Sequence, residues 1–157
     1  MVHSPQVTLT THRHRGFDCL CGNMRMAARA VTTLYDGHLA PAGLTAAELS
    51  VLWCVVSAQP VSMQKISEFL AMEKSTVTRN VAHLMARHLL KVETGEDARM
   101  KQVSVTRAGR EAFVRALPLW KEAQKAAAKA LGQPRFRTLV AGSLHLARIP
   151  KTGKQPH

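Results

Sequence analysis

Two stretches in the middle of the chain place apolar residues at the spacing of short helices. In the first stretch the apolar residues are Ile66, Phe69 and Leu70. In the second, from Ser75 to Ala86, they are Val77, Val81 and Leu84. Residues three and four apart share one face of a helix, so each stretch predicts a helix with one edge toward the core. The pattern breaks at residues 72–74, which separates the two helices.

The outward face of the second helix has no bulky apolar residue. Turning the helix by roughly 100° per residue places Ser75, Arg79, Ala82 and Ala86 on that face. Such a face suits the DNA major groove, because hydroxyl and guanidinium groups reach phosphates and base edges, while small residues let the backbone approach closely. The alternative, which this helix alone leaves open, is an ordinary solvated helix face.

Two segments rich in β-branched residues follow, at residues 90–94 and 102–105. They flank a polar loop that begins at Gly95, so the pattern predicts a two-stranded hairpin. The tip carries Asp97, Arg99 and Lys101. An arginine at such a tip fits the narrow, negative minor groove of A·T-rich DNA. In the alternative interpretation, Arg99 is only solvated and Asp97 caps the turn.

Longer apolar stripes predict helices on both sides of this unit. One helix is expected over residues 17–39, and the capping box formed by Thr45 and Glu48 predicts the start of the next. Thr106 is expected to cap a further helix, and a last helix is expected over residues 134–147. The predicted fold class is therefore mainly α with a small β-hairpin wing, as in a winged helix-turn-helix.

The order of these elements, from Cys21 to Gly109, resembles the MarR family of bacterial transcription regulators. The matching segments are residues 25–35, 39–45, 74–81, 97–99 and 105–110. Each segment alone is a weak signal, but their order and spacing together are specific. The resemblance implies an obligate homodimer that binds a pseudo-palindromic operator in double-stranded DNA, usually as a repressor relieved by a small molecule or an oxidant.

This resemblance divides a single domain, residues 1–157, into functional regions. We expect dimerisation helices at residues 17–44 and 123–148, a winged helix-turn-helix at 45–106, a linker helix at 107–122 and a disordered tail at 149–157. The residues expected to contact DNA are Ser62, Gln64, Lys74, Ser75, Thr76, Thr78, Arg79, Asn80, His83, Asp97, Arg99 and Lys101.

Composition and charge agree with a helical protein that binds a polyanion. Of the 157 residues, 46% are hydrophobic and only 4% are aromatic, which suits one helical domain. The net charge is +12, yet no acidic residue follows Glu122. Most of the positive excess therefore lies outside the predicted winged helix-turn-helix. No stretch suits a bilayer span or a signal peptide, which predicts a cytoplasmic protein without a membrane partner.

Motifs of catalysis are absent from the sequence. It contains no Gly-rich phosphate loop, no H-E-x-x-H and no nucleophile elbow, so neither an enzyme nor a cofactor is expected. A winged helix that serves as a protein-interaction or architectural module is the alternative from another class. Such a module would expose aromatic or aliphatic residues on its recognition helix, where this chain has polar ones.

Effector binding is the leading prediction for how the protein is controlled. An aromatic acid or phenol is expected between the first, second and fifth helices, as is common in the family that the chain resembles. The residues expected to bind it are Met24, Arg25, His38, Trp53 and Trp120. For the two tryptophans, a purely structural place in the core is the alternative.

Cysteine chemistry offers two other sensor models. Cys19 and Cys21 lie at the start of the first helix, where the helix dipole favours a thiolate. The spacing from Cys21 to Tyr35 is similar to that in the family's organic hydroperoxide sensors, although Arg25 and Ala46 stand where those sensors carry other tyrosines. The second model is a metal site. Its ligands would be His12, His14, Cys19 and Cys21, but their spacing matches no usual structural zinc site, so no metal is expected.

Overall fold

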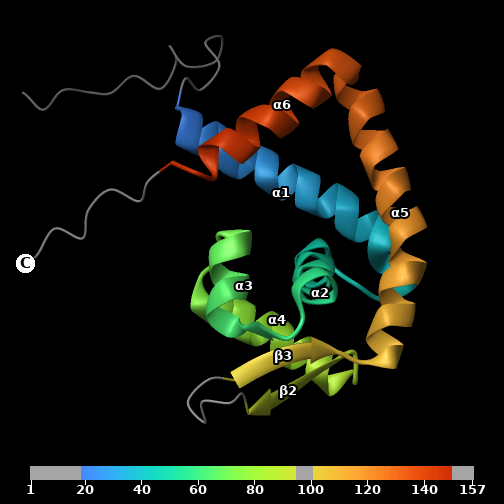
Figure 1. The fold of residues 1–157 in the computed structure, drawn as a ribbon. Helices are drawn as coiled ribbons and strands as arrows, with labels where there is room; N and C mark the ends of the chain where they lie inside the picture. The colour runs from blue at the N-terminus through green and yellow to red at the C-terminus, as the bar shows by residue number, and fades with distance from the viewer. Residues whose placement is uncertain (1–18, 95–100, 150–157) are drawn as a thin grey trace, which may run out of the picture.

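The computed structural model describes residues 19–94 and 101–149 and consists of a small head and a frame of long helices (Figure 1). The helices are α1 (Leu20–Leu39), the short 3-10 helix η2 (Ala40–Ala42), α2 (Ala46–Ala58), α3 (Met63–Leu70), α4 (Lys74–Ala86), α5 (Arg107–Leu131) and α6 (Gln133–Leu146). The strands are β1 (Val61–Ser62), β2 (Leu90–Thr94) and β3 (Lys101–Val105). The predicted class, mainly α with a winged helix-turn-helix, is confirmed.

The head contains α2, α3, α4 and the sheet, whereas α1, α5 and α6 form the frame (Figure 1). In the figure α5 rises from the sheet along one side of the molecule, and α6 returns from its upper end toward the start of α1. The head and the frame therefore meet along α5 and along the packing of α1 on α2.

The wing is a three-stranded antiparallel sheet in the order β1-β3-β2. Leu90 pairs with Val105, and Val92 pairs with Val103, as expected for a hairpin of residues 90–94 and 102–105. The predicted two-stranded ribbon is corrected by β1, in which Val61 pairs with the other side of Val103. A two-residue strand has no periodicity of its own, and so the hydrophobic pattern could not indicate it.

The core of the head is formed by the predicted helix stripes, with one correction. Ile66, Val77, Val81 and Leu84 are buried, and they pack with residues of α2 and the sheet. Phe69, which the pattern assigned to the same inward edge as Ile66, is instead 77% exposed. Helix α3 has only eight residues, and Ile66 together with half-buried Leu70 already fills its contact with the core.

Helix boundaries follow local capping chemistry. Thr45 and Glu48 form the predicted capping box at the start of α2, and the Thr106 hydroxyl caps α5 by accepting the Gly109 N–H. Helix α5 continues without a break to Leu131, so the expected boundary between the linker region and the dimerisation region, at residues 122–123, falls inside one helix and stays a prediction. Pro118 lies inside this helix without ending it, and the Ala-rich run of residues 123–130, which has high helix propensity, carries the helix on to Leu131 before Gly132.

The first turn of α5 is fixed against the carbonyl of Leu89. The Thr106 N–H donates to that carbonyl oxygen at 3.1 Å, and the Thr106 hydroxyl donates to the neighbouring His88 carbonyl at 2.7 Å. Gly109 packs so closely on the same carbonyl that a Cβ at this position would overlap the Leu89 oxygen. The direction in which α5 leaves the head therefore depends on a hydroxyl at residue 106 and a missing side chain at residue 109.

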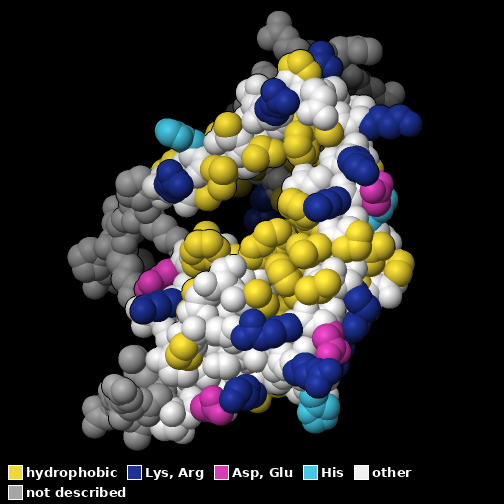
Figure 2. Space-filling model, turned by 45° about the vertical axis from the view of Figure 1, so that its right-hand side comes forward, with side chains coloured by type: hydrophobic (Ala, Val, Ile, Leu, Met, Phe, Trp, Pro, Cys, Tyr) yellow, Lys and Arg dark blue, Asp and Glu magenta, His cyan; other side chains and the backbone are white. Residues whose placement is uncertain are grey.

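Apolar side chains remain on the outer surface of the frame. Helix α6 contains no buried residue, and its Leu139, Val140 and Leu144 are all exposed. In Figure 2 hydrophobic side chains gather in the upper part of the molecule, where α5 and α6 lie, and across its middle. Contiguous apolar surface of this kind is typical of a face that another molecule covers.

Within the described residues, no single helix is long and apolar enough to cross a bilayer. Only the consecutive segments 20–42 and 46–58 meet that length and composition together, and they are bent by 69° relative to each other.

Replacing Gly109 with alanine should lower the free energy of unfolding by about 1 to 3 kcal/mol, because the new methyl group forces α5 away from Leu89. The matched control is Gly37→Ala in α1, where an added Cβ meets open space, so the variant should keep or slightly gain stability. Urea denaturation at fixed protein concentration measures both. Equal stability of the two variants would contradict the close contact.

Candidate functional site

The outward face of α4 is polar and accessible, as the sequence predicts. Ser75, Thr78, Arg79 and Ala82 are all exposed, and Thr76 is half-buried. The Thr78 hydroxyl donates to the Lys74 carbonyl at 2.9 Å, which leaves its oxygen lone pairs free to accept from a ligand. Hydroxyl and guanidinium groups therefore share one exposed face of α4, whose large exposed apolar side chain, Met85, lies toward the other end of the helix.

Asn80 does not belong to this surface, which corrects the prediction that it contacts DNA. Its side chain is buried, with 8% relative exposure, and its amide nitrogen donates to the Thr76 carbonyl at 3.0 Å. Asn80 lies three residues after Val77 and four before Leu84, so it shares the inward face with the core residues. In this structure the Asn80 side chain therefore binds the backbone of its own helix.

The other predicted DNA contacts come from the start of α3, from α4 and from the start of β3. Ser62 caps α3 by accepting the Lys65 N–H at 3.3 Å, and exposed Gln64 donates to Glu68 at 2.8 Å. Lys74 and Lys101 are exposed, at the start of α4 and of β3. Asp97 and Arg99 lie outside the described residues, so their contact with DNA stays a prediction.

The residues predicted to bind an effector do not meet in one place. Trp53 and Trp120 are in contact, with ring centroids 5.3 Å apart and ring planes at 65°. Met24 lines a different cavity, of about 340 Å³, between α1, α5 and α6. Arg25 is exposed, and His38 lies near Glu122, where it adds to the effect of Lys125 in lowering the pKa of that carboxyl. Only the two tryptophans form a common wall, so the five-residue site is corrected.

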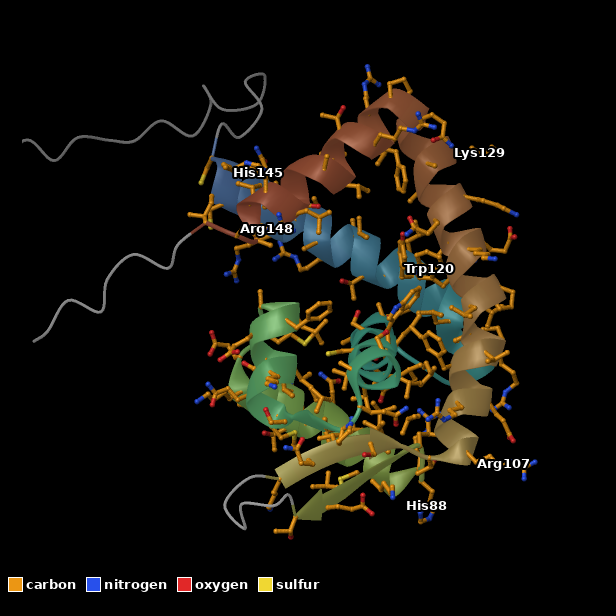
Figure 3. All side chains as sticks on the ribbon, in the orientation of Figure 1. His88, Arg107, Trp120, Lys129, His145 and Arg148 are labelled. Atoms are coloured by element: carbon orange, nitrogen blue, oxygen red, sulfur yellow. The ribbon has the colours of Figure 1, made fainter. Side chains whose placement is uncertain are left out.

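The two tryptophans line a cavity of about 240 Å³ between α1, α2, α3 and α5, which we call the aromatic cavity. Its walls include Tyr35, Ser50, Trp53, Phe69, Leu70 and Trp120. Figure 3 shows Trp120 directed inward from α5. The ring of Phe113 meets Trp53 edge-on, with centroids 5.3 Å apart, and so supports this wall. A cavity of this size holds a molecule with a single substituted ring.

Tyr35, which the sequence relates only to Cys21, lines both the aromatic cavity and the cavity that contains Met24. Burial raises the pKa of its hydroxyl, so this group stays protonated and able to donate a hydrogen bond at neutral pH. Its position four residues before buried Leu39 was the signal that could have found it, since both lie on one face of α1.

The cysteines divide into two accessible thiols and one buried thiol. Cys19 and Cys21 are exposed, and the Cys19 sulfur accepts the Gly22 N–H at 3.4 Å, which makes it the N-cap of α1. Cys54 is buried beside Trp53, and burial raises the pKa of its thiol. No group of three or more His, Cys, Asp or Glu side chains that could hold a metal occurs in the part of the chain that the structure describes. His12 and His14 lie outside that part.

Sequence comparison decides the family. The sequence model of the MarR family matches residues 42–100. The M. tuberculosis transcriptional regulator MosR, in its structure in complex with DNA, is 32% identical, with a TM-score of 0.71, over 84% of this chain and 100% of that one. This chain belongs to the MarR family. Its members are DNA-binding transcription regulators, so the protein is a winged-helix transcription regulator.

Further relatives agree with this assignment. The uncharacterised HTH-type transcriptional regulator YwoH of Bacillus subtilis is 31% identical over 88 residues. The match covers 56% of this chain and 64% of YwoH, so the chain spans slightly less than two thirds of the length of that relative. A probable transcriptional regulator from Pseudomonas aeruginosa has a TM-score of 0.76 over 84% of this chain and 99% of that one, but it is 23% identical and supports the fold alone.

In this MarR-family chain, a buried carboxylate holds α4 against the rest of the head. The Glu48 side chain accepts the Thr45 N–H at 3.0 Å, and its oxygens lie 3.8 Å from Arg87 and 3.9 Å from His83. Arg87 also donates to the Gly43 carbonyl at 2.7 Å. Glu48 thus joins the start of α2 to the last turn of α4, and Arg87 extends this link to the end of η2.

Replacing Glu48 with alanine should lower the free energy of unfolding by about 1 to 3 kcal/mol, because the capping box is lost and the Arg87 guanidinium loses its buried partner. The control, Glu93→Ala, removes an exposed carboxylate paired with Lys91 and should change it by less than about 1 kcal/mol. Urea denaturation measures both changes. Equal small losses would mean that Glu48 does not anchor α4.

Proposed function

We propose that the protein is a homodimeric, sequence-specific regulator that reads a pseudo-palindromic operator, acting as a repressor. Its two α4 helices enter successive major grooves about 34 Å apart, and the two Arg99 wings reach the adjacent minor grooves. The observation that carries this proposal is the outward face of α4. It presents Ser75, Thr78 and Arg79 to solvent without a bulky apolar residue among them.

The proposed dimer forms through the apolar surface of the frame. Leu139, Val140 and Leu144 of α6 are exposed, as are Leu20 and Val31 of α1. A second copy of the chain that packs its own α1 and α6 on these residues would remove this apolar area from water. In that arrangement, the frame sets the spacing of the two reading heads.

Release from DNA is proposed to follow from binding of a small aromatic effector in the aromatic cavity. The cavity lies between α2 of the head and α1 and α5 of the frame, so a bound molecule contacts both. A second proposed trigger is oxidation of Cys19 or Cys21, the two exposed thiols at the start of α1. Release of operator DNA by hydrogen peroxide, with and without reductant, tests this second trigger.

Replacing Arg79 with alanine should weaken operator binding by about 1 to 3 kcal/mol, because a guanidinium on the reading face is lost. The control is Arg135→Ala, which removes the same charge from exposed α6 and should leave operator affinity nearly unchanged. Gel-shift titration at fixed salt, on a fragment selected by the wild-type protein from random DNA, measures both. Equal affinity of both variants would refute the assignment of α4 as the reading helix.

Replacing Leu139 with aspartate should weaken self-association about a hundredfold or more, since an unpaired carboxylate in an apolar interface loses its hydration without a compensating partner. Val114→Asp, on an exposed position of α5, is the matched control and should remain dimeric. Sedimentation equilibrium reports the dissociation constants. A Leu139→Asp protein that stays dimeric would place the interface elsewhere.

A further inference from the structure

The positive charge of the described residues is concentrated in the frame, not in the head. Residues 46–94, which include α2, α3, α4 and β2, contain five lysines and arginines and four carboxylates. Residues 20–35 and 123–149, all in the frame, contain no carboxylate and seven basic residues: Arg25, Arg29, Lys125, Lys129, Arg135, Arg137 and Arg148. Most of this charge therefore lies on helices that the proposed reading of an operator does not use.

Helix α6 separates its apolar residues from its basic ones. The side that lines the cavity between α1, α5 and α6 carries Phe136, Leu139, Val140 and Ser143. The far side, at spacings of four, four and three residues, carries Arg137, Ala141, His145 and Arg148. The last helical turn extends to Arg148, whose N–H donates to the His145 carbonyl at 3.1 Å. All four residues are exposed, and we call them the basic face of α6.

The arginines of α6 form no ion pair with any carboxylate that the structure describes, whereas Lys125 of α5 pairs with Glu122 at 2.7 Å. Arg135 lies in the first turn of α6 and Arg137 directly after it, and this turn contains no acidic residue. The positive end of a helix dipole favours carboxylates and disfavours cations. An arrangement that is unfavourable within the chain itself is typical of a surface whose anions come from another molecule.

The basic face lies at the end of the molecule away from α4. In Figure 1 α6 crosses the upper end of the frame, whereas α4 and the sheet lie at the lower end, with α1 and α2 between them. Duplex DNA has a persistence length of about 50 nm, so it stays nearly straight over the length of one small domain. A duplex that is bound by α4 therefore does not reach α6.

We propose that the basic face of α6 is a second DNA-binding surface, which holds the phosphate backbone of a second duplex without reading its sequence. Its basic side chains extend over about 16 Å of helix, with only the small Ala141 among them. Along a duplex, one phosphate charge occurs for about every 1.7 Å. Figure 3 shows His145 and Arg148 at one end of α6 and Lys129 near the other, so the charge extends along the whole helix.

Double-stranded DNA fits this face better than other polyanions do. The basic face has no aromatic ring on which an unpaired base of a single strand would stack. The exposed apolar residues of α6, which a membrane surface would need, are covered by the second copy in the proposed dimer. The inference goes beyond the proposed function, because it gives a regulator that is bound to its operator the means to bridge to another segment of DNA.

Capture of a second duplex tests the proposal directly. An operator fragment, selected by the wild-type protein from random DNA, is fixed to beads, saturated with protein and washed. A fluorescent duplex of unrelated sequence is then titrated onto the complex. We expect saturable capture that weakens steeply as the salt concentration rises. Anisotropy titration of the free protein with the same unrelated duplex gives the salt dependence without an operator.

A pair of double variants tests the residues. Arg137→Gln with Arg148→Gln removes two charges from the basic face, and Arg110→Gln with Arg115→Gln removes two charges from exposed positions of α5 nearer the sheet. The first should weaken capture about tenfold or more and lower the slope of log affinity against log salt by about 2, since two phosphate contacts are lost. The control should keep both values. Both variants should bind an isolated operator fragment as the wild type does.

Each other outcome overturns the proposal. Absence of capture by the wild type would mean that α6 binds no duplex, and equal losses in the two double variants would mean that only net charge matters. Weaker binding of the first variant to the isolated operator fragment would place α6 on the operator itself. Vesicles of phosphatidylserine and phosphatidylcholine are the final comparison. If the first variant loses binding to these vesicles but still captures the duplex, the basic face binds membranes instead of DNA.

Discussion

The arrangement of head and frame depends on how α5 is held at the carbonyl of Leu89. The Thr106 backbone and hydroxyl bond to the end of the α4–β2 connection, and Gly109 lets the helix approach it without a side chain between them. Because α5 has 25 residues, a small change in its direction at the first turn moves its far end by a large distance. The positions of Trp120 and of α6 therefore follow from a contact made within the head.

Glu48 supplies the second connection, and it acts on the C-terminal turn of α4. Its carboxylate caps α2 and pairs with Arg87, which in turn binds the backbone at Gly43. Helix α4 is thus held at its C-terminal turn by the segment that follows α1. Its N-terminal end follows the short turn that ends α3.

Hydrophobic periodicity was sufficient for most of the fold, because buried stripes and caps are local signals. Ile66, Val81 and Leu84 are buried as predicted, and Thr45 and Thr106 cap helices as predicted. Periodicity failed where tertiary packing decides which edge of a short helix faces inward, as for Phe69, and where a polar residue bonds its own helix, as for Asn80. The prediction of a five-residue effector site failed for a related reason. The spacing of residues along a helix does not specify which neighbouring helix each residue contacts.

Charge places a limit on where specificity can arise. After Glu122 the sequence has basic but no acidic residues, so the general attraction for a polyanion is not concentrated in the head. Phosphate contacts fix the register of a protein on DNA, but they do not distinguish sequences. In the proposed complex, discrimination then depends on the placement of a few groups on α4, such as Ser75 and Arg79. Because a dimeric reader of this kind requires both α4 helices to be in register at once, a small shift of α4 is sufficient to lose the operator while the non-specific attraction persists.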